Sequence, residues 1–121
     1  MIVTATRSVT PLFDGAWVKA GTFIAAIGSS KPDALELDDA LLARASTLVV
    51  ESLEQARSEA GDLLMAAPGV VNWDNIVELG ALLANHRSVH RARGDLTIFK
   101  SLGFGLTDVA LAGLIMRRMS P

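Results

Sequence analysis

The feature that most constrains the fold is the alternation of short, continuous apolar runs with segments that carry helix-capping signals. Continuous rather than alternating apolar runs are typical of parallel strands that are covered on both faces. Strands that alternate with helices indicate a parallel α/β sheet, and the early crossovers predict one half of a doubly wound sheet. The runs of strand length are Ile2–Thr6, Thr22–Ile27, Thr47–Glu51 and Leu96–Phe99.

Helices are predicted where capping residues precede apolar residues at three- and four-residue spacing. Asp33 with Glu36 has the spacing of a capping box, with Asp38 as a second candidate N-cap for the same helix. Ser52 begins another box, and Thr107 is the predicted cap of the last helix. The predicted helices span residues 33–45, 52–60, 72–84 and 107–119.

Composition argues against several classes of partner. The formal net charge is −2, so no overall field attracts nucleic acid or an anionic membrane. No apolar run approaches the roughly 20 residues of a transmembrane helix. The chain has no cysteine, which excludes disulfides and thiolate metal sites, and we expect a cytoplasmic protein. Half of the residues are apolar and mean hydropathy is +0.39, which predicts more exposed apolar surface than one small domain usually leaves.

Few side chains form a recognisable catalytic or metal-binding pattern, and we assign no catalytic residue and no metal site. Gly103 and Gly105 lack the third glycine of a phosphate-binding turn, so they indicate a turn into the last helix. His86 and His90 have the spacing of metal ligands on a helix, but their arginine-rich surroundings favour an exposed loop. We interpret Lys100 as a solvated surface lysine rather than a catalytic one.

The ends of the first two predicted strands are candidate binding positions. Thr4–Thr6 and Ile27–Ser30 combine small side chains with hydroxyls. Ligands of open α/β sheets bind outside the carboxyl ends of the strands, where small side chains let a flat ring approach the backbone. From the pattern alone, ordinary strand termination is the favoured interpretation of Thr4–Thr6. For Ile27–Ser30, a tight turn capped by serine and a binding role both stay open.

Longer stretches of the sequence resemble the ornithine cyclodeaminase/mu-crystallin family, in order and over nearly the whole chain. The resemblance implies the C-terminal half of a Rossmann-like, doubly wound, mostly parallel sheet with flanking helices. Residues 1–121 would form a single partial NAD(P)-binding domain, and helix 107–119 would pack toward an N-terminal domain that this chain lacks. The stretches that carry the resemblance are VTATRSVTP, AIGSSKPDALELDDALLARA, EAGDLL, IVELGALL and TIFKSLGFGLTDVALAGLI.

The family's chemistry is hydride transfer between a nicotinamide, of NAD or NADP, and an imine or amine carbon of a small imino or amino acid. Ser30 is the implied substrate-side residue, at the position where true cyclodeaminases carry a catalytic aspartate. A serine cannot act as that base at neutral pH, which favours the mu-crystallin-like ketimine reductases. The residues implied to contact the cofactor are Val3, Thr4, Thr6, Ile27, Gly28 and Ser101.

The family's glycine-rich turn and its substrate-binding arginine and lysine precede the region that this chain resembles. We therefore expect a fragment of a nicotinamide-dependent imine reductase or amino-acid dehydrogenase that is inactive alone. Whether this chain binds any cofactor by itself stays open. An uncovered strand edge predicts a homo-oligomer or pairing with the missing N-terminal half. The alternatives are a ligand-binding or assembly module, and one half of a split enzyme.

Overall fold

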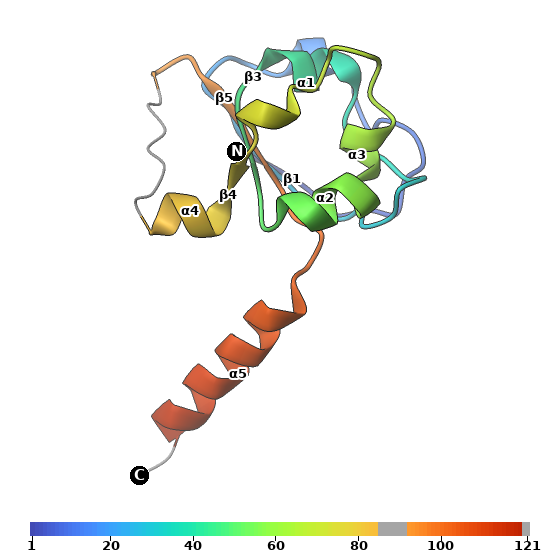
Figure 1. The fold of residues 1–121 in the computed structure, drawn as a ribbon. Helices are drawn as coiled ribbons and strands as arrows, with labels where there is room; N and C mark the ends of the chain where they lie inside the picture. The colour runs from blue at the N-terminus through green and yellow to red at the C-terminus, as the bar shows by residue number, and fades with distance from the viewer. Residues whose placement is uncertain (85–91, 120–121) are drawn as a thin grey trace.

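The computed structural model describes residues 1–84 and 92–119. Within these residues, five parallel strands form one sheet in the order β1-β2-β5-β3-β4 (Figure 1). The carboxyl ends of the strands therefore lie at one edge of the sheet, at the bottom of Figure 1. The predicted α/β class with a parallel sheet is confirmed. The strands are β1 (Ile2–Thr4), β2 (Phe23–Ala26), β3 (Ala45–Val50), β4 (Val77–Glu78) and β5 (Leu96–Lys100).

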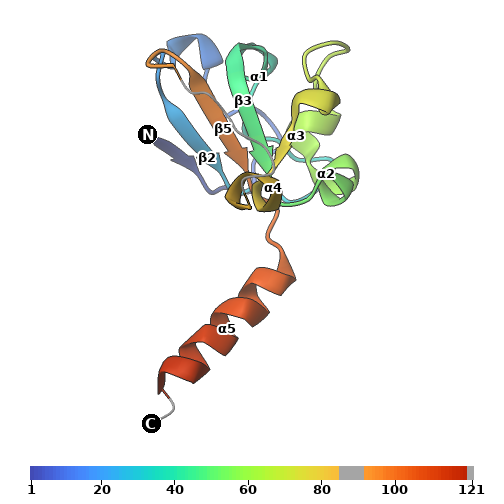
Figure 2. The ribbon, with the colours of Figure 1, turned by 60° about the vertical axis from the view of Figure 1, so that its left-hand side comes forward.

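The helices lie on both sides of this sheet, and the last one extends away from it. Figure 1 shows α2 and α3 on one side and α4 on the other, and Figure 2 shows the same arrangement after a turn of the molecule. None of the described helices is long and apolar enough to cross a membrane. The helices are α1 (Asp39–Arg44), α2 (Leu53–Glu59), α3 (Gly61–Leu64), α4 (Leu79–Leu83) and α5 (Gly105–Met119), with 3-10 turns η1 (Gly15–Trp17) and η2 (Trp73–Asn75).

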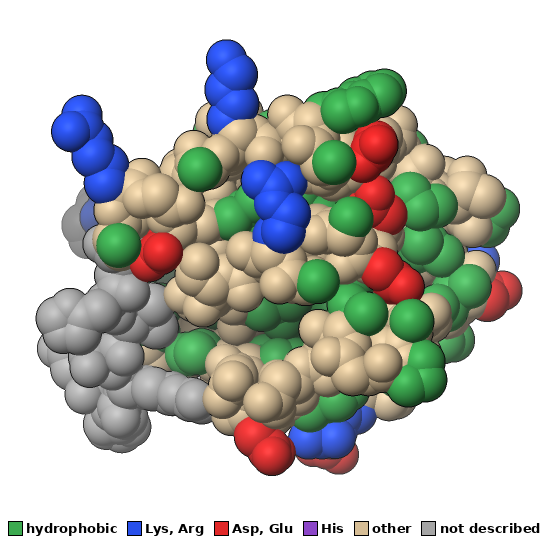
Figure 3. All heavy atoms as spheres, turned by 90° about the horizontal axis from the view of Figure 1, so that it is seen from above, with side chains coloured by type: hydrophobic (Ala, Val, Ile, Leu, Met, Phe, Trp, Pro, Cys, Tyr) green, Lys and Arg blue, Asp and Glu red, His purple; other side chains and the backbone are tan. Residues whose placement is uncertain are grey.

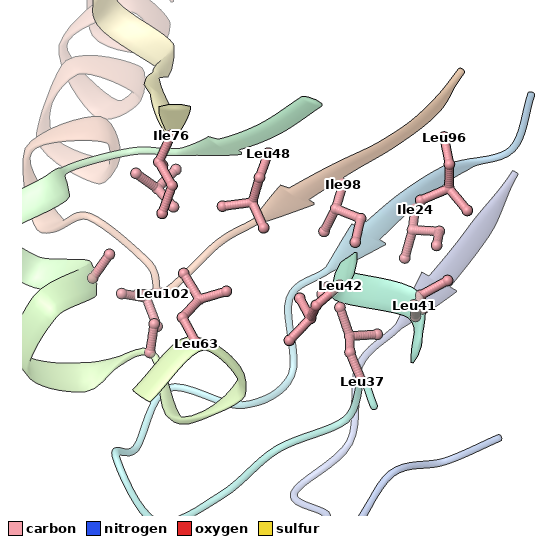
Figure 4. Close-up of a cluster of buried hydrophobic side chains, with 14 of the residues drawn as sticks. Ile24, Leu37, Leu41, Leu42, Leu48, Leu63, Ile76, Leu96, Ile98 and Leu102 are labelled. Carbon is pink, nitrogen blue, oxygen red and sulfur yellow. The ribbon is translucent and has the colours of Figure 1, made fainter. Parts of the chain in front are cut away.

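The hydrophobic core lies between one face of the sheet and helices α1 to α3 (Figure 4). Ile24 of β2, Ile98 of β5 and Leu41 of α1 are fully buried there. Each such side chain contributes about 1.5–3 kcal/mol when it leaves water. Burial alternates along β2 and β5, and the residues on their other face, such as Phe99, are only half-buried. The expectation that both faces are fully covered was therefore wrong for the described residues.

Residues 72–84 form three short elements rather than the single predicted helix, so that prediction was wrong. Asn72 does act as an N-cap, but only of η2. Val77 and Glu78 then pair with β3 as a short strand that the sequence pattern does not predict. Ile76 and Val77 are buried to 2% and 4% exposure, whereas Leu83 remains 75% exposed. The β-branched residues Ile76 and Val77 are stabilised more by packing against the sheet than they would be on one face of a helix.

The predicted capping box of Asp33 with Glu36 does not form. Helix α1 begins at Asp39, and the side chain of Asp38 accepts the amide of Leu41 at 2.8 Å as the N-cap. The second candidate cap is therefore the one that is used. Glu36 lies outside any helix, and its carboxylate is buried among other partners described below.

Helix α5 is apolar, and none of its residues is buried. The chain enters it through Gly103, whose φ of +77° lies in the left-handed region that favours glycine. Thr107 is not its cap, because its hydroxyl donates to the carbonyl of Phe104 from inside the helix. Figures 1 and 2 show α5 projecting away from the sheet. Its exposed large apolar residues are Leu106, Val109, Leu111, Leu114, Ile115, Met116 and Met119.

Candidate functional site at the carboxyl edge of the sheet

Four hydrogen bonds converge on the carboxylate of Glu36, whose exposure is 0%. Thr6 donates its amide at 2.6 Å and its hydroxyl at 2.8 Å to Oε1. The Thr4 hydroxyl at 2.8 Å and the Gly28 amide at 3.1 Å donate to Oε2. Burial by itself raises the pKa of the Glu36 carboxyl, but these donors outweigh it and hold the pKa below the ordinary value of 4.5. Glu36 is therefore ionised at neutral pH.

A buried ion pair lies directly behind this carboxylate. Lys100 Nζ lies 2.8 Å from Asp62 Oδ2, and both side chains have 0% exposure. Asp62 Oδ1 accepts the amides of Glu36 at 2.6 Å and of Leu37 at 2.9 Å. Lys100 also donates to the carbonyl of Ser29, in the turn after β2. The interpretation of Lys100 as a solvated surface lysine was wrong, since it lies on the core side of β5.

Two glycines allow the chain segments around these carboxylates to meet. A Cβ at Gly28 would lie 2.1 Å from the amide nitrogen of Thr6 and 2.4 Å from Oε1 of Glu36. A Cβ at Gly61 would lie 2.1 Å from the carbonyl oxygen of Ala34. Real Cβ contacts are never this short, so glycine is required at both positions if the cluster is to close.

Three of the predicted cofactor-contacting residues lie on the opposite face of the sheet from this cluster. Val3 is 52% exposed and Ile27 is 48% exposed, whereas Thr4, which follows Val3, and Ala26, which precedes Ile27, are buried. Ser101 directly follows the core-facing residue that ends β5, so alternation directs it to the same open face. Its hydroxyl donates to Oε1 of Glu51, and Oε2 of the same carboxylate accepts the amide of Leu102 at 3.1 Å. This edge of the open face therefore carries two apolar side chains and the Ser101 hydroxyl, which is bonded to the Glu51 carboxylate.

The other three predicted cofactor-contacting residues, Thr4, Thr6 and Gly28, are the donors to Glu36. Sequence reasoning found these positions but missed Glu36 and Lys100 as members of the site. A signal for Lys100 was present, because it continues the period-2 pattern of inward residues along β5. No local signal distinguishes Glu36 from a helix-capping residue, since its partners are 8 to 32 residues away in sequence.

A hollow of about 380 Å³ opens beside Gly28, at the end of β2. Ser30, the predicted substrate-side residue, lines this hollow and is exposed. Arg7 and Lys31 give the hollow a mainly positive rim, with Asp33 as the one acidic side chain in the lining. The complete lining is Arg7, Val9, Gly28, Ser29, Ser30, Lys31, Asp33 and Ala34.

The other end of the sheet has a different character. Seen from above in Figure 3, Lys and Arg side chains project separately from a surface on which apolar and polar groups are interspersed. Such an arrangement is typical of a solvated surface. In the described ranges, no three His, Cys, Asp or Glu side chains are grouped so that they could hold a metal ion. His86 and His90 lie outside the described residues.

The fold and this edge together define the class of the protein. A parallel sheet with flanking helices, with polar and small residues at the carboxyl ends of its strands, is the arrangement of Rossmann-like nucleotide-binding domains. The sequence model of the ornithine cyclodeaminase/mu-crystallin family matches residues 1–121, and the chain belongs to this family.

Similar proteins include enzymes that act on imines. The chain is 38% identical to the ketimine reductase mu-crystallin of Mus musculus over 115 residues, which are 95% of this chain and 34% of the mouse protein. The crystal structure of a probable ornithine cyclodeaminase from Bordetella pertussis Tohama I superposes with a TM-score of 0.90 at 53% identity, covering 98% of this chain and 38% of that chain. The Thermococcus litoralis Δ1-pyrroline-2-carboxylate reductase in complex with NADH and L-proline superposes with a TM-score of 0.85 at 32% identity. The match covers 93% of this chain and 36% of that chain.

The chain spans about a third of the length of the curated relatives that it matches, 34% of the mouse protein. The relatives include ketimine and pyrroline-2-carboxylate reductases, and solved relatives carry NAD or NADH. The resemblance inferred from the sequence is confirmed.

Proposed function

We propose that this chain supplies the nicotinamide side of the active site in an NAD(P)-dependent imine reductase or amino-acid dehydrogenase. In this proposal, residues 1–121 form a single partial dinucleotide-binding domain, and α5 packs toward the N-terminal domain of a complete enzyme. The observation that carries it is that Ile27 and Ser101 follow the carboxyl ends of the adjacent parallel strands β2 and β5, and that Val3 is exposed on the neighbouring β1, level with Ala25. This edge is where open α/β sheets bind their ligands.

The residues at this edge have the right chemistry for a nicotinamide ring. Val3 and Ile27 offer an apolar surface for one face of a flat ring, and Ser101 adds an oxygen beside it. The hydroxyls of Thr4 and Thr6 are already committed as donors to Glu36, so only their lone pairs remain for a ligand. When bound, the nicotinamide supplies the hydride of the reaction; the role of these residues is to hold the ring and to exclude water from one side of it.

The hollow beside Gly28 is the proposed substrate side, for the imine carbon of a small imino acid. Ser30 lies in this hollow, and a serine hydroxyl can donate or accept a hydrogen bond but cannot serve as a base at neutral pH. The positive rim of Arg7 and Lys31 suits an anionic substrate. These features favour imine reduction over ornithine cyclisation, which needs an activating base.

The proposal is tested with the purified chain, alone and mixed with a polypeptide that carries the N-terminal half of a relative. Oxidation of NADH or NADPH by Δ1-pyrroline-2-carboxylate is followed at 340 nm. We expect no turnover by the chain alone, because the family's substrate-binding residues precede this region, and turnover that requires both polypeptides. Turnover by the chain alone would contradict its role as a fragment.

Self-association is a second proposed property, and the exposed apolar length of α5 favours it. A monomeric soluble protein rarely exposes contiguous apolar surface of more than a few hundred Å². A second copy of the chain, or the missing N-terminal half, would cover this helix.

A further inference from the structure

We infer that Glu36 is a positioning residue for the carboxyl edge, which fixes the turns after β1 and β2 relative to each other. By doing so it holds together the two strand ends that carry Val3 and Ile27, the two apolar side chains assigned above to the nicotinamide. The link to the cofactor rests on the proposed function, whereas the fixing of the two turns does not.

The pairing of β1 and β2 ends before the two backbone amides that Glu36 binds. The ladder between these strands continues as far as the hydrogen bond from the Ile27 amide to the Thr4 carbonyl, at 2.9 Å. Beyond this point in the described chain, the Glu36 carboxylate takes over, because it accepts the amide of Thr6 on one oxygen and that of Gly28 on the other. One carboxylate therefore joins two turns, each of which begins two residues after the end of its strand.

Glu36 is itself held in place. Its backbone amide donates to Asp62 Oδ1, and Asp62 is fixed by its ion pair with Lys100 at the end of β5. Lys100 donates to the carbonyl of Ser29, which follows Gly28. The ends of β1, β2 and β5 are thus joined through one connected set of buried charges, so a shift at one strand end is transmitted to the others.

The four donors around Glu36 require an acceptor that carries no donor of its own. An ionised carboxylate has acceptor sites for all four donors and no donor of its own. In Glu36→Gln, an NH2 group would face two of these donors and could not accept from them. The substitution keeps the shape and burial of the side chain, so it removes the bridge without creating a cavity. Glu54→Gln is the matched control, because Glu54 is an exposed glutamate in the first turn of α2.

The primary experiment is amide hydrogen exchange by NMR on the purified chain. We expect the amides of Thr6 and Gly28 to be protected, and the amide whose acceptor oxygen is replaced by the NH2 group to exchange about tenfold faster or more in Glu36→Gln. The amide of Leu48, in the centre of β3, should be unchanged, and Glu54→Gln should match the wild type throughout. Unchanged exchange at Thr6 and Gly28 in a folded Glu36→Gln chain would overturn the inference.

A wild-type measurement keeps the inference testable if Glu36→Gln does not fold. The amide shifts of Thr6 and Gly28 are followed while the pH is lowered, and we expect both to titrate with one common midpoint below 4.5. Asp62, which accepts the backbone amide of Glu36, accepts neither of these two amides. Different midpoints for the two amides, or no titration, would show that they do not share one carboxylate.

The link to the cofactor is measured separately, by NADH fluorescence with the same variants. We expect Glu36→Gln to weaken NADH binding about tenfold, with Glu54→Gln unchanged. Loss of amide protection with undiminished NADH affinity would overturn the cofactor part of the inference. If the wild type does not bind NADH, the proposed contribution of this edge to cofactor binding fails for the chain alone, and the exchange experiment still decides whether Glu36 fixes the two turns.

Discussion

Lys100 is the largest side chain that the described chain buries completely, between Asp62 and the carbonyl of Ser29. A buried ion pair is weak evidence for net stability, because both charges lose their hydration. Removal of one partner is a different matter, since the remaining charge then stays buried without its counterion. Asp62 would retain its two amide donors, which offset part of that cost.

Lys100→Met is expected to lower the free energy of unfolding by about 3–5 kcal/mol, because it leaves the Asp62 carboxylate buried and unpaired. Urea denaturation followed by circular dichroism measures this change. Lys19→Met, at an exposed position, should change stability by less than about 0.5 kcal/mol. Equal effects of the two substitutions would mean that the ion pair does not matter for folding.

Gly28→Ala is expected to destabilise the chain by about 1–3 kcal/mol, because its Cβ would overlap Thr6 and Glu36. Gly80→Ala is the matched control in α4, where an added Cβ meets nothing within 4 Å. Alanine is the better helix former there, so this change should stabilise by roughly 0.5–1 kcal/mol. The urea midpoint should fall in Gly28→Ala and rise in Gly80→Ala, and this difference checks the assignment of Gly28 to the closed cluster.

The lowered pKa of Glu36 predicts a loss of stability in acid. The carboxyl of Glu36 binds its proton less tightly in the folded chain than in the unfolded chain, where its pKa is near 4.5. The ionised carboxylate therefore stabilises the fold above that pH. The stabilisation is lost as the pH falls from 4.5 through the lower pKa that Glu36 has in the folded chain. Urea midpoints measured between pH 6 and pH 3 should therefore fall more steeply for the wild type than for Glu36→Gln. Parallel curves would contradict this role of the carboxylate.

At the scale of elements, α5 stands apart from the rest of the fold. The strands and α1 to α3 stabilise each other through the core, whereas no residue of α5 is buried. Isolated helices of this length are only marginally stable in water. The helix therefore depends on a surface that the described part of the chain does not provide.

Deletion of residues 105–121 should leave the stability of the sheet unchanged within about 0.5 kcal/mol, because it removes no contact that the core uses. The urea midpoint of the truncated chain, compared with that of the full chain at low protein concentration, is the measurement. A clear drop in the midpoint would show that α5 packs on the sheet of its own chain.

Considered as a whole, the described part of the molecule leaves two extended apolar regions exposed. One is the half-covered face of the sheet beside the free edge of β1, and the other is α5. Free strand edges and exposed apolar helices are both common routes to association between copies.

The purified chain is expected to be a dimer or a larger oligomer that NADH does not dissociate. Multi-angle light scattering with and without NADH measures this directly. The substitution Leu111→Glu together with Ile115→Glu places charges on one face of α5 and should shift the population toward monomer. A monodisperse monomeric wild type would contradict self-association and would mean that α5 is stable when exposed.

Sequence reasoning predicted the sheet well because a strand in a parallel sheet carries a local signal. This signal is a short run of apolar residues, such as the runs around Ile24 and Leu48. It failed where the outcome depends on distant partners. Residues 72–84 have helical spacing, but β3 offers Val77 a better partner. Lys100 and Glu36 look like surface residues until the turns and α3 surround them. At the candidate site, the predicted positions are gathered at one edge, while the buried charges that hold this edge were not foreseen.

The complete burial of Lys100 also has a practical use. The chain contains three lysines, and the other two, Lys19 and Lys31, are exposed. An amine-reactive reagent should modify these two at once and reach Lys100 only in molecules whose carboxyl edge has opened. Mass spectrometry of a timed labelling reaction would then count opening events at this edge, with the two exposed lysines as the internal standard for reagent activity.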